Sequence, residues 1–178
     1  MAKKQALFLQ SWFSQTTDIW YPWIKSELEK RGYAVFLPDL PTIRAKTPNL
    51  TKMIQKVKQI LIIDKNTIII GHSIGTLVAM RLAEKYKFAK MIIVSGWDFD
   101  DLFKAHRLFW KTKINHRKIK NNVKDIVVIQ GEHDPYVTAS TAEEMSKRLN
   151  AKFVLVKGLG HFGNDDKCVR LPQILEFI

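Results

Sequence analysis

The feature that most constrains this 178-residue chain is an apolar run that ends at a serine held between two glycines. Residues 68–75 read Ile-Ile-Ile-Gly-His-Ser-Ile-Gly, which places Ser73 between Gly71 and Gly75. In a G-x-S-x-G segment a buried strand turns sharply into a helix and presents the serine at the turn. The glycines must stay small because larger side chains would collide with the neighbouring strand and helix. The segment therefore predicts a strand-turn-helix unit with Ser73 as a candidate nucleophile.

Short β-branched runs alternate with longer helical patterns along the rest of the chain. The strands are predicted at 5–10, 34–37, 67–70, 90–95, 126–130 and 153–156. The helices are predicted at about 18–30, 50–62, 74–86, 139–149 and 171–177. This alternation is typical of a parallel sheet covered by helices on both faces, so we expect an α/β fold with a three-layer α/β/α sandwich. No linker or internal repeat divides the chain, and residues 1–178 are predicted to form one domain.

The composition, with 46% hydrophobic and 26% charged residues, is typical of a folded globular protein. The single cysteine, Cys168, excludes an internal disulfide, and no Cys-rich metal site is present, so neither a metal nor a cofactor is expected. No apolar run approaches the roughly 18 residues that a membrane span needs. The apolar stretch 6–9 is too short for a signal peptide and is predicted to be a first strand instead. These observations favour a cytoplasmic location.

Two further segments place an acid and an imidazole after strands. Asp134 lies in the turn that follows strand 126–130, and His161 lies in the loop that follows strand 153–156. The carboxyl ends of parallel strands meet at one edge of a sheet, where sites assemble. The chain order Ser73, Asp134, His161 is the order of the α/β-hydrolases. It predicts a serine hydrolase that cleaves a small carboxylic ester, thioester or amide through an acyl-enzyme, with His161 as general base and Asp134 orienting it.

The tetrahedral intermediate of such a reaction needs hydrogen-bond donors for its oxyanion. One is predicted to be the backbone amide of Ile74, immediately after the nucleophile. The other is expected from the loop after the first strand, near Ser11, Trp12 and Phe13, and we select Trp12.

Other polar residues compete for these roles. Glu132 and His133 flank the predicted acid, but both are expected to face solvent. His72, at the variable position of the serine motif, is expected to pack or to form a hydrogen bond. His106 and His116 are expected to be exposed polar residues.

The sequence resembles the small serine hydrolases of the retinoblastoma-binding protein 9 and YdeN type, within the α/β-hydrolase superfamily. The resemblance spans nearly the whole chain and rests on five segments: 20–23 (Trp-Tyr-Pro-Trp), 67–73, 92–96, 131–137 and 160–162. It implies a reduced α/β-hydrolase fold whose six-stranded parallel sheet has the order 2-1-3-4-5-6. It also implies carboxylesterase-like activity with Ser73, Asp134 and His161 as the triad.

Two departures from the family pattern bear on the site. Gln10-Ser11 stands where YdeN-type members have His-Gly after the first strand, which leaves the position of the second oxyanion donor open; the Ser11 hydroxyl is one alternative. The Leu-x-Cys-x-Glu motif that is associated with the retinoblastoma pocket is absent, so that partner is not expected.

The connector 97–124 is long for this architecture and is predicted to form a small cap. Its aromatic residues either cover the serine or merely pack the connector onto the sheet. Together with the loop after the first strand, they give a predicted substrate pocket that contains Gln10, Ser11, Phe13, Trp97, Phe99 and Trp110.

The connector is also strongly basic, and the whole chain has a net charge of +12. A solvated basic face is the simpler interpretation, with a small anionic acyl substrate as the alternative. No nucleic-acid-binding module is recognised, so no nucleic acid is expected as a partner. A second functional hypothesis is a non-enzymatic binding protein that uses the basic, aromatic connector on a hydrolase fold.

Overall fold

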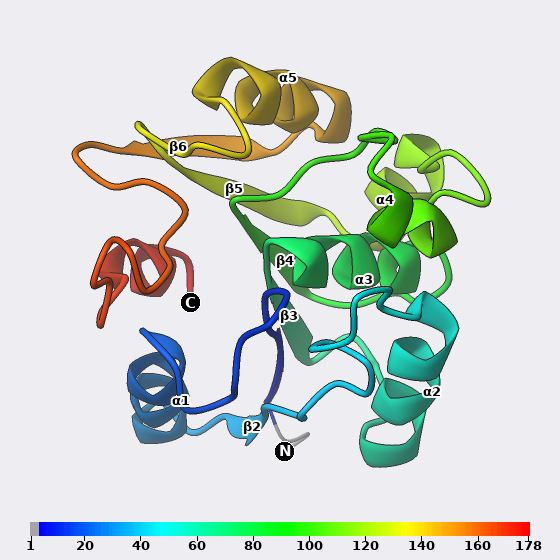
Figure 1. Ribbon diagram of the computed structural model, residues 1–178. Helices are drawn as coiled ribbons and strands as arrows, with labels where there is room; N and C mark the ends of the chain where they lie inside the picture. The colour runs from blue at the N-terminus through cyan, green and yellow to red at the C-terminus, as the bar shows by residue number, and fades with distance from the viewer. Residues whose placement is uncertain (1–3) are drawn as a thin grey trace.

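The computed structural model describes residues 4–178 and contains one six-stranded parallel sheet with the order β2-β1-β3-β4-β5-β6. This order confirms the predicted topology. The strands are β1 (Gln5–Leu9), β2 (Ala34–Phe36), β3 (Thr67–His72), β4 (Lys90–Val94), β5 (Asp125–Gly131) and β6 (Lys152–Val156). Figure 1 shows the sheet between two layers of helices.

The helices divide between the two faces of the sheet. One face is covered by α2 (Leu50–Ile60), α3 (Ile74–Ala83), α4 (His116–Asn122) and α5 (Ala139–Leu149), and the other by α1 (Tyr21–Lys30) and the terminal 3₁₀ helix η2 (Pro172–Phe177). Successive residues of a strand point to opposite faces, and here both faces are buried. Leu7 and Leu9 pack on the α3 side, whereas Ala6 and Phe8 pack on the α1 side. This two-sided burial explains the near-continuous apolar runs of the strands.

Helix boundaries differ from the sequence-based expectations in four places. The helix predicted at 50–62 ends at Ile60. The first helix was predicted from residue 18 but begins at Tyr21, because Asp18 accepts the Gln15 amide in a turn that precedes it. The helix predicted at 74–86 ends at Ala83. The segment predicted as a helix at 171–177 forms the 3₁₀ helix η2, which starts at Pro172.

The connector contains two short helices that were not predicted, η1 (Lys104–Phe109) and α4. Arg81, which is almost fully buried on α3, donates to the carbonyl oxygens of Phe109, Thr112 and Lys113. Asp98, whose side chain is 1% exposed, accepts hydrogen bonds from Arg148 of α5 and from the His116 imidazole of α4. Two buried charged groups therefore attach the connector to the helical layer.

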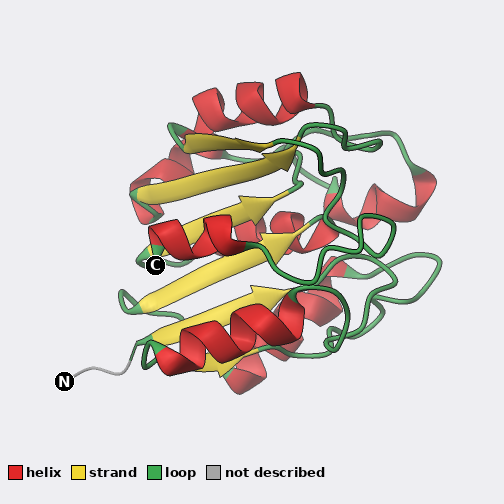
Figure 2. Ribbon diagram, turned by 90° about the vertical axis from the view of Figure 1, so that its left-hand side faces the viewer, coloured by secondary structure: helices red, strands yellow, loops and turns green. Residues whose placement is uncertain are grey.

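All six strands point the same way, and the long loops gather at their carboxyl ends, as Figure 2 shows. The segments that follow β1, β3, β4, β5 and β6 carry every predicted site residue. Gln10, the first residue after β1, is buried.

Candidate active site

Ser73 lies at the junction of β3 and α3 in a strained backbone conformation, with φ 54° and ψ −123°. Positive φ is unfavourable for a residue with a Cβ and persists only where the surroundings enforce it. Here the Ser73 amide donates to the Val94 carbonyl of β4, and the Ser73 carbonyl accepts from the amide and hydroxyl of Thr76. These bonds hold the serine at the turn.

Space on both sides of the turn requires glycine. A Cβ on Gly75 would lie 2.2 Å from the Leu9 carbonyl oxygen of β1, and one on Gly71 would lie 2.8 Å from the Gly75 carbonyl oxygen and from Thr76. The neighbouring strand and helix therefore approach these residues too closely for any side chain. This is the collision expected from the sequence.

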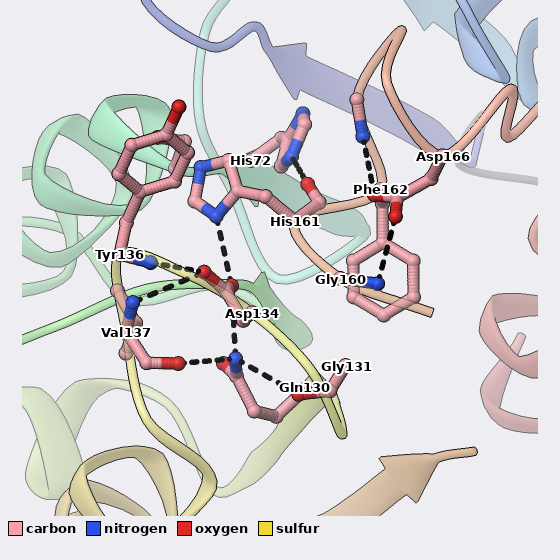
Figure 3. A network of polar contacts seen from close by, with 12 residues as sticks. His72, Gln130, Gly131, Asp134, Tyr136, Val137, Gly160, His161, Phe162 and Asp166 are labelled. Atoms are coloured by element: carbon pink, nitrogen blue, oxygen red, sulfur yellow. Dashed lines mark hydrogen bonds and ion pairs between the residues drawn. The ribbon is translucent and has the colours of Figure 1, made fainter. Parts of the chain in front are cut away.

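The acid and the imidazole meet across two loops, as Figure 3 shows. His161 Nδ1 lies 2.8 Å from Asp134 Oδ2, and since a carboxylate only accepts, Nδ1 carries the proton. Asp134 Oδ2 also accepts from the Gln130 side-chain amide, and Oδ1 accepts from the backbone amides of Tyr136 and Val137. The carboxylate is thus held by four donors.

Burial raises the pKa of Asp134, but the hydrogen bond and charge of His161 and the amides of Val137 and Tyr136 outweigh it and lower the pKa to about 2. The carboxylate is therefore ionised at neutral pH, and of the two neutral tautomers of His161 it selects the one whose proton is on Nδ1. An unprotonated Nε2 is the nitrogen that a general base requires.

Ser73 and His161 line one cleft of about 1070 Å³ at the carboxyl edge of the sheet. No hydrogen bond joins the Ser73 hydroxyl to His161 within residues 4–178. Catalytic hydrogen bonds are commonly long before substrate binds, so this geometry is compatible with proton transfer.

The loop after β1 uses most of its backbone amides internally. The Ser11 amide donates to the Tyr21 hydroxyl, the Phe13 amide to the Ile43 carbonyl and the Ser14 amide to the Ser11 carbonyl. Of the four consecutive amides of residues 11–14, only that of Trp12 lacks an acceptor within the described residues. The Ile74 amide is the first of α3 and has no acceptor in its own helix.

The cleft wall agrees only in part with the predicted pocket. Ser11, Phe13, Trp97 and Phe99 line it, as do Trp12 and Ile74. Gln10 does not, because its side chain is fully buried and donates to the Ser14 carbonyl. The aromatic ring of Trp110 packs against the core on the α3 side instead of lining the cleft. The prediction that these last two residues contact the pocket was therefore wrong.

The cleft carries a charge opposite to that of the chain. Its lining includes four aspartates and neither lysine nor arginine, although the chain has 29 Lys and Arg against 17 Asp and Glu. The aspartates are Asp18, Asp101, Asp165 and Asp166. Exposed aromatic side chains stand among them: Phe13, Phe99, Phe103 and Tyr136.

The competing polar residues have varied surroundings. Glu132 and the His133 side chain are exposed, as expected, and lie 3.5 Å apart. His106, expected to be exposed, is buried beneath Trp12 and Phe103, with Nδ1 2.6 Å from Asp101.

The roles of Gln130 and Tyr21 were not predicted. Gln130 is the single polar residue of the apolar run 126–130 and Tyr21 belongs to the Trp-Tyr-Pro-Trp segment, so both left a signal in the sequence.

Within residues 4–178 no cluster of three or more His, Cys, Asp or Glu side chains could hold a metal ion, and no helix is long and apolar enough to cross a bilayer.

Comparison with known proteins places this geometry in a family. The chain is 29% identical to the serine hydrolase RBBP9 of Rattus norvegicus over 153 residues, which cover 84% of this chain and 81% of that protein. It is 24% identical to the hydrolase YdeN of Bacillus subtilis, covering 98% of this chain and 94% of that protein. The crystal structure of the B. subtilis ydeN product superposes with a TM-score of 0.85 at 23% identity, covering 97% and 95% of the two chains.

More distant structures share the fold. Est1E of Butyrivibrio proteoclasticus, whose structure contains ferulic acid, gives a TM-score of 0.71 at 16% identity and covers 98% of this chain and 89% of its own.

The family model described as Serine hydrolase matches residues 6–178, nearly the full length. The chain therefore belongs to the serine hydrolase family and has an α/β-hydrolase fold.

Proposed function

We propose that the protein hydrolyses small carboxylic esters through an acyl-enzyme formed on Ser73. The observation that carries the proposal is the Asp134-His161 pair, joined at 2.8 Å, whose imidazole lines one cleft with a serine on a strained turn. A structural turn does not need a buried carboxylate that fixes the tautomer of a neighbouring imidazole. That arrangement suits a base that removes a hydroxyl proton.

In the proposed mechanism His161 Nε2 takes the Ser73 proton while the hydroxyl oxygen attacks the ester carbonyl carbon. Asp134 stabilises the imidazolium, which then protonates the leaving alcohol as the carbon-oxygen bond breaks. Water, deprotonated by His161, attacks the carbonyl carbon of the acyl-enzyme. The imidazolium then returns the proton to Ser73 Oγ as the bond between that oxygen and the acyl carbon breaks and the acid leaves. The backbone amides of Ile74 and Trp12 are the proposed donors to the oxyanion in both tetrahedral intermediates.

The charge of the cleft leads us to propose an uncharged or cationic acyl substrate in place of the anionic one suggested by net charge. Four aspartates at the wall repel a carboxylate and attract an ammonium group, and exposed aromatic faces can contact either an apolar chain or a cation.

A fluorophosphonate probe tests the nucleophile. We expect labelling of the wild-type protein and none of Ser73→Ala, with Ser95→Ala, a buried serine after β4, as a labelled control. Absence of labelling in folded wild-type protein would refute the enzymatic proposal and favour the binding-protein hypothesis.

The p-nitrophenyl esters of hexanoate, 6-aminohexanoate and adipate test the charge preference. We expect the anionic adipate monoester to have the lowest kcat/KM, and the gap to narrow in high salt and in Asp165→Asn, since Asp165 is exposed and lines the cleft. A preference for the adipate monoester would contradict the proposed substrate class.

A further inference from the structure

A buried chain of hydrogen bonds connects the loop after β1 with the loop that carries His161. Ser11 N lies 3.1 Å from the Tyr21 hydroxyl oxygen, which lies 2.6 Å from His72 Nδ1. His72 Nε2 lies 2.8 Å from the His161 carbonyl oxygen. The side chains of Tyr21 and His72 are shielded from solvent. Figure 3 shows the His72 end of the chain.

The direction of each bond follows from what each atom can donate. The His161 carbonyl only accepts, so His72 Nε2 carries a proton. Burial and the neighbouring His161 lower the pKa of His72 to about 3, so the ring is neutral and Nδ1 has a lone pair. Nδ1 therefore accepts from the Tyr21 O–H, and the Tyr21 oxygen accepts from the Ser11 amide. Because the single hydroxyl proton of Tyr21 is used on His72, the contact of 3.0 Å between the two hydroxyl oxygens of Tyr21 and Ser11 requires the Ser11 hydroxyl to donate.

The loop that receives the bond is conformationally strained. Phe162, directly after the imidazole, has φ 54°, an unfavourable value for a non-glycine residue. Its carbonyl accepts a hydrogen bond from the Trp20 indole N–H at 3.2 Å. Two successive carbonyls, those of His161 and Phe162, are thus held by His72 and Trp20.

At its other end the chain determines which amide of the β1 loop remains for a ligand. Because the Ser11 amide donates to Tyr21, it does not point to the oxyanion, and the next amide, that of Trp12, is left without an internal acceptor. Tyr21 therefore contacts the loop after β1 directly and, through His72, the loop that carries His161.

We propose that His72 is a positioning residue which, through hydrogen bonds to Tyr21 and to the His161 carbonyl, aligns the general base and the Trp12 amide with Ser73. This inference rests on the proposed ester hydrolysis. His72 directly precedes the nucleophile, so the His72-Tyr21 pair sets the relative position of the serine, the base and the second oxyanion donor.

The hydrogen-bond directions are tested by NMR on the wild-type protein, with no reference to activity. The nitrogen resonances of His72 should show a protonated Nε2 and an unprotonated Nδ1 from about pH 5 to pH 8. A protonated Nδ1 would overturn the proposal, because the tyrosine could then not donate to it.

The positioning role is tested by kinetics on folded variants. His72→Leu removes both bonds and should lower kcat by on the order of 10²-fold while KM stays within about twofold, because misplacement of catalytic groups acts mainly on the chemical step. His72→Gln can donate to His161 and accept from Tyr21, and should restore most of the loss. Tyr21→Phe should lower kcat less, and Tyr33→Phe, on a partly buried tyrosine before β2, should leave kcat unchanged.

Wild-type kcat in folded His72→Leu would overturn the positioning role. If His72→Leu does not fold, the tautomer in the wild-type protein and the kcat of Tyr21→Phe decide the question. Failure of the proposed hydrolysis itself is separately visible, since the wild-type protein would then not react with the fluorophosphonate.

Discussion

Burial of His72 should make the stability of the fold begin to fall at about pH 6.5, before the carboxylates start to titrate. The perturbation is the substitution His72→Gln, which keeps a donor and an acceptor but removes the titrating group. In the folded protein burial lowers the pKa of His72 from 6.5 to about 3. In the unfolded chain the imidazole regains its ordinary pKa of about 6.5.

The direction of the effect follows from proton binding. Above about pH 6.5 the imidazole is neutral in both states and its titration contributes nothing. Below that pH the unfolded chain binds a proton that the folded protein refuses, so the free energy of unfolding falls as pH falls toward about 3. A pH of about 4.5 lies two units below the pKa of the imidazole in the unfolded chain. At about 1.36 kcal/mol per unit, the free energy of unfolding is lower there by about 2.7 kcal/mol.

Urea denaturation of the wild-type protein and His72→Gln at about pH 7.5, 5.5 and 4.5 measures this term as a difference. The contributions of groups shared by both proteins, including Asp134, cancel in the difference. The stability that Asp134 contributes is in any case lost only below about pH 4, because its pKa is lowered from 3.8 to about 2. We expect the wild-type protein to lose about 1.4 kcal/mol relative to the variant at pH 5.5 and about 2.7 kcal/mol at pH 4.5. Parallel curves for the two proteins would refute the assignment of His72 as a neutral, buried imidazole.

Three further outcomes test the site and its supports. Asp134→Asn should lower kcat for p-nitrophenyl esters by up to about 10⁴-fold, since His161 loses its fixed tautomer; full activity would exclude the triad. Gly75→Ala should destabilise the fold by about 1–3 kcal/mol or more in urea denaturation, because its Cβ would lie 2.2 Å from the Leu9 carbonyl oxygen, whereas Gly163→Ala, with nothing within 4 Å, should not. Arg81→Met should lower the free energy of unfolding by about 1.5–3 kcal/mol and speed tryptic cleavage in the connector, since the carbonyls of the connector lose their buried donor. Unchanged stability and cleavage would contradict that anchoring role.

The sheet was predictable from the sequence because its physics is local and repetitive. Strands buried on both faces must be apolar at every position, so the runs ending at Ile70, Val94 and Ile129 are recognisable without tertiary information. The order 2-1-3-4-5-6 came from the family resemblance, and the structure confirms it. Helix ends were less predictable, since a side-chain bond such as Asp18 to the Gln15 amide competes with the first helical turn.

The residues at the carboxyl edge could be named from the sequence because each lies in the segment that follows a strand, and the sheet order brings strand ends together. Ser73, Asp134 and His161 are found this way, and the structure places them at one edge. Residues that act at a distance from a strand end leave no such pattern. Tyr21 lies on α1, on the far side of the sheet from α3, and reaches the site only because its hydroxyl meets His72.

The connector shows the limit of composition as a guide. Trp97 and Trp110 are both aromatic and both were predicted to line the pocket, but only Trp97 does, because it lies close to the carboxyl end of β4. Trp110 follows η1 and packs toward the core. Whether an aromatic side chain points to the cleft or to the core depends on the path of short helices too irregular to predict from periodicity.

The net charge of the chain does not describe the cleft, because the exposed surface and the turns that line the cleft favour different charged residues. Lysine favours helix exteriors, where its stem lies on apolar surface and its ammonium group stays hydrated. Aspartate favours turns because its carboxylate accepts backbone amides: Asp18 does so in the turn before α1, and Asp166 accepts from Gly160 and Gly163 in the loop of His161. The turns that form the carboxyl edge thus bring negative charge to the wall of the cleft that Ser73 lines. Since charges beyond about 8 Å are largely screened at physiological salt, we expect the carboxylates of the lining to outweigh the net charge of the chain for a substrate in the cleft.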